Sequence, residues 1–141
     1  MSSIVFLVKL LISIVCLLLF TTTVESQTLR DHTGASVGRI DDQGVVRDAA
    51  GKTIGRIDRD GSVRDSAGRL KGRIDSDLNI RDASGRLIGR IENGRVRDAS
   101  GRLIGRVDPG GSVRDASGRL IGRSESVNKE YAAVFFFFFW D

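Results

Sequence analysis

The sequence predicts an all-β fold of tandem β-hairpin repeats, and three observations support this prediction. An eleven-residue motif, apolar-Arg-Asp-x-x-Gly-x-x-x-Gly-Arg, recurs about every 17 residues. Each repeat carries two turn signals, and apolar and polar residues alternate between them. A helix here would hold a Gly about every fourth residue, each costing roughly 1 kcal/mol against Ala. The six copies of the motif begin at Leu29, Val46, Val63, Ile80, Val96 and Val113.

The turn signals fix the expected strands. In the first, Asp48-Ala49-Ala50-Gly51, Asp can open a type I turn and Gly can adopt the left-handed conformation. This chemistry is typical of a three-residue hairpin loop with a glycine bulge. The second signal has the same form in Asp58-Arg59-Asp60-Gly61. Two turns in each repeat leave strands of about 4–6 residues, which is the usual strand length.

Differences between the copies indicate which positions face a core. In residues 87–92, alternation places Leu87, Gly89 and Ile91 on one face, opposite Ile88. The position before the second Gly of the motif admits Lys71 among aliphatic residues, so we expect it to be half exposed. Apolar residues flank five complete hairpins: Ile40/Val46, Ile57/Val63, Ile74/Ile80, Ile91/Val96 and Val107/Val113.

Counting these hairpins predicts a pseudo-fivefold radial arrangement, similar to a flower or propeller, within a repeat domain of residues 27–128. A single hairpin is barely stable in water, so the units must bury their apolar flanks against one another. They can do so in a closed ring or in an open solenoid. The terminal copies stay close to the consensus rather than forming distinct caps, which favours closure.

The C-terminal segment, residues 129–141, contains Tyr131, the run Phe135–Phe139 and Trp140, whereas the repeats contain no aromatic residue. A ring of small aliphatic hairpins would leave an axial gap, and we expect the segment to fill it as an internal plug. As a strand it would expose aromatic residues on both faces and so require burial all round. Self-association and shallow membrane contact through Phe135–Trp140 are the alternatives.

Residues 1–26 are predicted to be a signal peptide. An apolar run from Leu10 to Phe20 is followed by polar residues, and cleavage after Ser26 would leave Gln27 as the mature N-terminus. An uncleaved anchor and a lipoprotein acylated at Cys16 are the alternatives. The protein is therefore expected to be exported, to the periplasm, the outer surface or the extracellular space.

The repeats Arg-Asp-Ala-Ser-Gly-Arg-Leu-Ile-Gly-Arg, followed by Ala132-Ala133-Val134 and the run of Phe residues, resemble the five-fold β-flower proteins. That family consists of small exported repeat proteins of Gram-negative bacteria. The resemblance covers about residues 29–140 and implies a radial set of β-hairpin petals. This chain departs from the family in being rich in Arg and Asp where such repeats often carry Asn, Ser or Thr. The resemblance therefore implies no particular ligand.

The residue types argue against catalysis, cofactors and nucleic-acid binding. His32 is the one histidine, and no thiol would remain after removal of residues 1–26. Asp75-Ser76-Asp77 is similar to the start of a calcium loop, but Ile80 and Arg86 stand where Gly and Glu are needed. The net charge is only +4, and no aromatic residue alternates with the arginines, which disfavours nucleic acid. We expect a non-enzymatic structural or interaction module at the cell envelope.

Repeated arginines are the candidate functional residues. Alternation places two on the outer face of each hairpin, opposite the apolar flanks, together with an acidic residue such as Asp58. One interpretation is a ladder of Arg–Asp–Arg ion pairs. The other is a multivalent protein that binds an anionic envelope glycan or lipopolysaccharide through Arg forks. Another protein is also a possible partner. The candidate anion-binding residues are Arg39, Arg47, Arg56, Arg64, Arg73, Arg81, Arg90, Arg97, Arg106 and Arg114.

Overall fold

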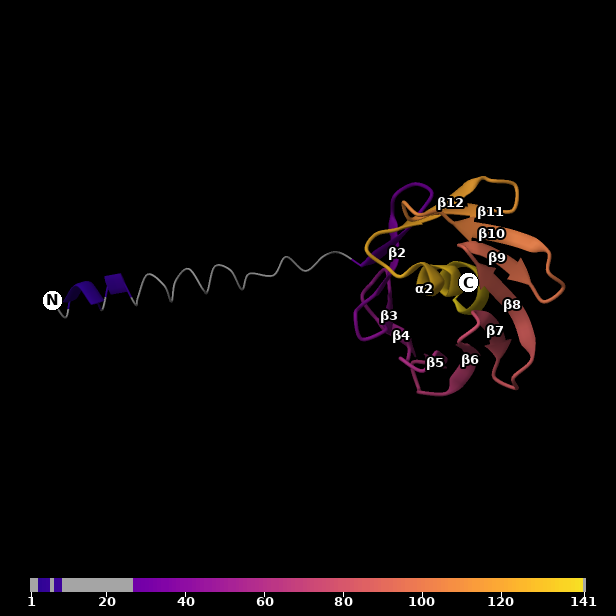
Figure 1. The fold of residues 1–141 in the computed structure, drawn as a ribbon, viewed down its shortest axis with the longest axis horizontal. Coiled ribbons are helices and arrows are strands. Elements are labelled where there is room, and N and C mark those ends of the chain that lie inside the picture. Colours follow the sequence, from indigo (N-terminus) through magenta and orange to yellow (C-terminus); the bar gives the residue numbers. More distant parts are fainter. Residues whose placement is uncertain (1–2, 6, 9–26, 141) are drawn as a thin grey trace.

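The structure is a computed structural model, which describes residues 3–5, 7–8 and 27–140. Twelve antiparallel strands form a closed barrel around a short C-terminal helix (Figure 1). The all-β hairpin fold predicted from the repeats is confirmed. The strands are β1 (Thr28–Asp31), β2 (Ser36–Ile40), β3 (Val45–Asp48), β4 (Thr53–Ile57), β5 (Ser62–Asp65), β6 (Leu70–Ile74), β7 (Asn79–Asp82), β8 (Leu87–Glu92), β9 (Arg95–Asp98), β10 (Leu103–Val107), β11 (Ser112–Asp115) and β12 (Leu120–Ser124).

The turns have the predicted chemistry. In the β3–β4 hairpin, the Gly51 N–H donates to the Asp48 carbonyl at 3.0 Å, and the Asp48 N–H donates to the Lys52 carbonyl at 2.8 Å. Gly51 has a φ of +87°, which places it in the left-handed region that Gly adopts at little steric cost. This pair of bonds defines a type I turn followed by a glycine bulge. The same pattern recurs in all six Asp-x-x-Gly turns that follow the odd-numbered strands.

Closure of the barrel involves both ends of the repeat region. β1 pairs with β12, and Leu29 lies opposite Ser124 in the register that Ile40 and Val46 have in the β2–β3 pair. The two ends of the chain thus supply a sixth pairing beside the five predicted hairpins. Exact fivefold symmetry is not shown by this arrangement. The closed ring leaves no unpaired edge strand, which explains why the terminal copies need no distinct caps.

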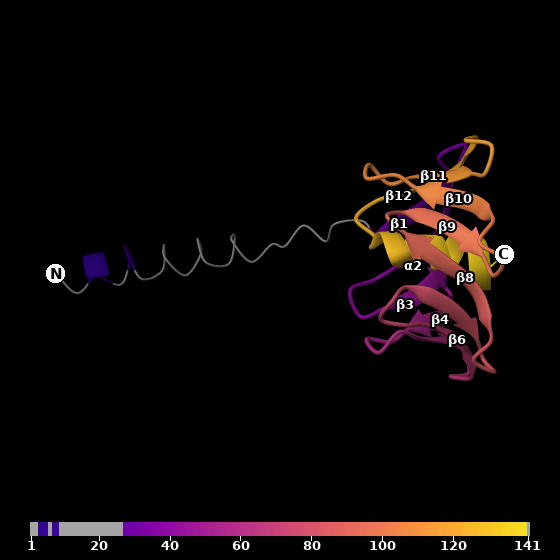
Figure 2. The same ribbon diagram turned by 45° about the vertical axis from the view of Figure 1, so that its right-hand side comes forward.

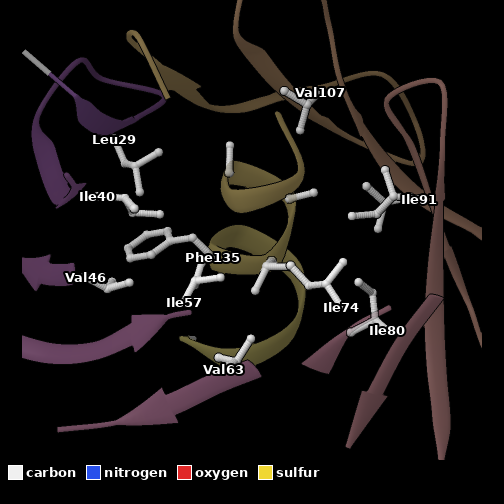
Figure 3. Packing of buried hydrophobic residues seen from close by; sticks show 14 of the residues in the cluster. Leu29, Ile40, Val46, Ile57, Val63, Ile74, Ile80, Ile91, Val107 and Phe135 are labelled. Atoms are coloured by element: carbon white, nitrogen blue, oxygen red, sulfur yellow. The ribbon is translucent and has the colours of Figure 1, made fainter. Parts of the chain in front are cut away.

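A layer of twelve side chains, one from each strand, lines the inner wall at the end of the barrel where the helix begins. Eleven are aliphatic and buried, and the twelfth is Ser124, which is 7% exposed and donates its hydroxyl to the Gly111 carbonyl at 3.2 Å. This layer surrounds the helix on all sides (Figure 3). The aliphatic members are Leu29, Ile40, Val46, Ile57, Val63, Ile74, Ile80, Ile91, Val96, Val107 and Val113.

Strict alternation fails at one position of each even-numbered strand. A register shift lies between Ile80 and Arg81 in the β7–β8 pair, and related shifts occur in the equivalent pairs. The extra residue of such a bulge redirects a side chain. Ile88 therefore packs against the core although alternation placed it on the outer face, so that assignment was wrong. Its half-buried state agrees with the sequence prediction.

The C-terminal segment lies inside the barrel, as the plug hypothesis predicts, but as a helix rather than a strand. It comprises α2 (Lys129–Val134) and the π-helix η1 (Phe135–Phe139). The Asn128 side chain accepts from the Glu130 and Tyr131 N–H groups at the start of α2. Helical hydrogen bonds satisfy the backbone without a neighbouring strand, so the six aromatic side chains of residues 135–140 can point outward. Figure 2 shows the helix running along the barrel axis, with the C-terminus at the opposite end.

The predicted signal peptide, residues 1–26, lies almost entirely outside the described residues and remains a prediction. Among the described residues, no helix is both long enough and apolar enough to cross a membrane.

Candidate functional site

The barrel interior is filled by contacts between aromatic rings and strand glycines. Six consecutive aromatic residues each lie against the central Gly of a different even-numbered strand. At Gly122, a Cβ atom would come within 2.6 Å of Phe136 Cε1 and 2.6 Å of the Arg30 carbonyl oxygen, so the space for a side chain is already taken. The pairs are Phe135–Gly38, Phe136–Gly122, Phe137–Gly105, Phe138–Gly89, Phe139–Gly72 and Trp140–Gly55.

Successive aromatic residues reach successive even-numbered strands. From Phe135 to Trp140 the rings contact β2, β12, β10, β8, β6 and β4 in spatial order. An α-helix turns by about 100° per residue, which is larger than the angle between neighbouring repeat units in a ring of six. The wider turn of a π-helix, with i→i+5 hydrogen bonds, reduces this mismatch. Trp140 returns to lie beside Phe135, with ring centroids 6.1 Å apart and planes at 28°.

A pocket lies where the first and last rings meet. The space there has a volume of about 480 Å³ and is lined by Val37, Ile54, Phe135, Phe136 and Trp140. The Trp140 Nε1 atom is buried and has no hydrogen-bond partner among the described residues.

Replacing Val37 with Ile is expected to stabilise the protein, because Ile occupies four of the other five equivalent positions and Val37 borders this pocket. One added methylene group should contribute about 0.8 kcal/mol to the free energy of unfolding, measured by urea denaturation. Val113→Ile is the matched control, since Val113 is fully buried and the larger side chain should lower stability there. A loss of stability in both variants would contradict this prediction.

Lys71 occupies the position that the other repeats fill with Val or Ile, and it is half buried. Its side chain points toward the plug: Nζ donates to the Phe139 carbonyl at 2.5 Å and lies 5.1 Å from the Trp140 ring centroid. A cation at the C-terminus of a helix interacts favourably with the helix dipole, and an ammonium over an indole adds a cation–π contact. Lys71 thus holds the C-terminal end of the aromatic helix. The sequence predicted only that this position is half exposed and did not predict this contact.

The outer face carries six pairs of arginines. In each pair the two residues lie directly opposite one another on neighbouring strands. The structure places all ten sequence-predicted arginines in five of these pairs. The sixth pair, Arg30 and Arg123, was missed because its members belong to β1 and β12, whose pairing depends on closure. The predicted pairs are Arg39/Arg47, Arg56/Arg64, Arg73/Arg81, Arg90/Arg97 and Arg106/Arg114.

Carboxylates separate most of these like charges. Asp58 lies between Arg56 Nε at 3.3 Å and Arg64 Nε at 3.0 Å. Asp108 and Glu92 bridge their pairs in the same way, whereas Asp75 and Glu125 each contact one arginine. The predicted bridge of two arginines by one carboxylate is therefore present in three of the six pairs, and two further pairs have a single ion pair. These side chains are partly exposed, so each pair contributes under about 1 kcal/mol.

Hydrogen bonds lower the pKa of several Asp residues that open turns. The Ser84 hydroxyl donates to Asp82 Oδ1 at 2.7 Å and is the largest cause of the lowered pKa of Asp82; backbone N–H groups add to it. The pKa values of Asp98 and Asp115 are lowered in the same way by Ser100 and Ser117. A carboxylate with a lowered pKa is poorly suited to act as a general acid near neutral pH.

The remaining candidates for chemistry occupy ordinary positions. Asp75 Oδ1 accepts from the Asp77 and Asn79 N–H groups and so caps a turn, as the simpler sequence interpretation held. His32 is exposed. Within the described ranges, no group of three or more His, Cys, Asp or Glu side chains is arranged to hold a metal ion.

The fold and the interior define a closed barrel of hairpin repeats filled by the protein's own aromatic helix. The family described as 5-fold beta-flower protein matches residues 26–140. The chain belongs to this family, and it is a β-repeat protein, as its resemblance to that family indicated. No curated protein and no solved structure matches the chain.

Proposed function

We propose that this protein is an exported, non-enzymatic structural or interaction module of the cell envelope that acts through its outer surface. The supporting observation is the occupied interior. Six aromatic rings lie against six strand glycines, so the space in which a small barrel would hold a ligand is taken by the chain itself. The outer wall with its turns is left for a partner, together with the pocket between Phe135 and Trp140.

The outer wall suits repeated contacts. Its turns repeat nearly the same hydrogen bonds around the ring, and each adjacent pair of strands presents charged side chains at a similar place. A partner with repeated groups could therefore engage several units at once, which raises overall affinity without any strong single contact.

Fractionation of cells that produce the full chain tests the proposal. We expect a mature form that begins at Gln27, in the periplasmic, envelope or culture fraction, as determined by N-terminal sequencing. A form that keeps residues 1–26 and remains in the cytoplasm would contradict it. A variant with Asp in place of Leu17 is the control, because a charge in the apolar run should block export without touching the barrel.

A second candidate function is multivalent binding of an anionic envelope glycan or lipopolysaccharide. One observation favours it: among the described residues, neither Arg39 nor Arg47 has an ion pair, although the two lie directly opposite each other. Like charges that face each other across two strands are destabilising unless something neutralises them. An anion bound at this pair would do so.

A further inference from the structure

We propose that the groove bordered by Arg47, Arg56 and Arg64 is the anion-binding site of the barrel and accepts a phosphate monoester group carried by an envelope glycan. This inference rests on the second candidate function and deepens it by assigning one site and one chemical class. The groove lies over β3, β4 and β5 and has a volume of about 330 Å³. The Thr53 and Ser66 side chains also line it.

Arg47 differs from the five arginines at the same repeat position. Each of the other five has a nitrogen within 3.8 Å of a carboxylate oxygen and also donates Nη1 to the carbonyl of a turn glycine. Arg47 instead donates Nη1 to Thr53 Oγ1 at 2.8 Å. The equivalent residue in four of the other repeats is Leu, which cannot accept a hydrogen bond.

The acidic residue at the neutralising position does not pair with Arg47. Asp41 holds the position of Asp58, and its Oδ1 accepts from the Gln43 N–H at 2.9 Å and the Val45 N–H at 3.0 Å. Asp75 has the same two bonds to Oδ1, but its Oδ2 also lies 3.4 Å from Arg81 Nε. No ion pair joins Asp41 to an arginine within the described part of the chain. The charge of Arg47 therefore remains available to a ligand.

The one carboxylate in the groove is also occupied. Asp65 Oδ1 accepts from the Ala67 and Arg69 N–H groups, each at 2.9 Å, and its Oδ2 accepts from Arg69 Nε at 3.2 Å. The backbone bond from Arg69 is the largest cause of the lowered pKa of Asp65. Arg56 and Arg64 share the single carboxylate of Asp58. The three guanidinium groups thus bring more positive charge to the groove than its carboxylates offset.

Two hydroxyl groups complete the site. Thr53 Oγ1 accepts from Arg47, which leaves its own hydrogen free to donate. Ser66 directly follows Asp65, whereas Ser84, Ser100 and Ser117 stand two residues after their aspartates and bond to them. Ser66 is one of the residues that line the groove. Guanidinium forks beside hydroxyl donors match the geometry of a phosphate group.

The test is a titration of the barrel, residues 27–141, with inorganic phosphate and with glucosamine 4-phosphate, followed through the Arg Nε–Hε signals in NMR spectra. We expect both probes to shift the Arg47 signal most. Arg47→Gln should weaken binding about tenfold, the loss of one charge-assisted contact. The matched control is Arg97→Gln, at the same repeat position with a carboxylate nearby, and its affinity should stay within about twofold of the parent.

The possible outcomes distinguish a failure of the Arg47 groove from a failure of anion binding in general. An equal loss of affinity in both variants would overturn the assigned groove and leave general anion binding by the arginines intact. Binding of inorganic phosphate without any preference for the sugar phosphate would overturn the glycan assignment. If neither probe binds the parent, both the groove and the second candidate function fail. Thermal unfolding of both variants checks that the barrel remains folded, since Arg47 and Arg97 lie on its outer wall.

Discussion

A chain that ends at Val134 is expected to lose its cooperative fold. The truncation removes all six aromatic rings that contact the strand glycines. Full burial of a large apolar side chain stabilises a protein by about 1.5–3 kcal/mol, so six partly buried rings at half that value contribute about 5–9 kcal/mol. This amount is comparable with the whole stability of a small domain, about 5–15 kcal/mol. Urea denaturation followed by far-UV circular dichroism measures the loss.

A graded series keeps this prediction falsifiable. Chains that end at Phe137 and Phe139 retain three and five of the rings, and their midpoints should lie between those of the full chain and the shortest form. All variants begin at Gln27, so the N-terminal segment does not affect the comparison. An unchanged midpoint across the series would mean that the barrel is stable without its plug.

Replacing Gly122 with Ala is expected to lower the free energy of unfolding by about 1–3 kcal/mol, a typical cost of overpacking a core. The new methyl group would lie 2.6 Å from both the Phe136 ring and the Arg30 carbonyl oxygen. Arg30 belongs to β1, so the clash falls on the pairing that closes the barrel. Chemical denaturation and the dispersion of amide NMR signals measure the effect.

Gly110→Ala is the control for this variant, because a Cβ atom at Gly110 would meet no atom within 4 Å and Gly110 does not have a positive φ. Adding Phe136→Leu to Gly122→Ala should recover part of the lost stability, since a smaller side chain yields space. Equal stability of the two alanine variants would show that the ring does not rest on this glycine.

The repeat pattern predicted the strands and the turns because each depends on residues close together in sequence. An Asp three residues before a Gly specifies a type I turn through its own hydrogen bonds, and Leu78 at φ +63° shows that the turn forms even where Gly is missing. The buried layer followed from alternation for the same reason. At Ile88, a bulge that alternation does not encode redirected the side chain.

The other features that sequence reasoning missed depend on closure or on the plug. Ser124 stands where the other repeats have Ile or Val, yet it completes the buried layer opposite Leu29. The pair of Arg30 and Arg123 could not be found from the sequence, because it exists only when β1 pairs with β12. The sequence contains six consecutive aromatic residues and six equivalent strand glycines, so their match could have been found by counting. It was missed because a strand was expected for Val134–Trp140. The side chains of a strand alternate between two faces and cannot point in six directions around a ring.

The pairing of β1 with β12 has a consequence for biosynthesis. Residues 28–31 are among the first of the barrel to be synthesised, but their partners, residues 122–124, and the aromatic helix follow about 90 residues later. A nascent chain can form individual hairpins early, yet it cannot complete the ring or exclude water from its centre until residues 122–140 have been made. Contacts between such distant residues slow folding, so the whole molecule matures in a single late event rather than petal by petal.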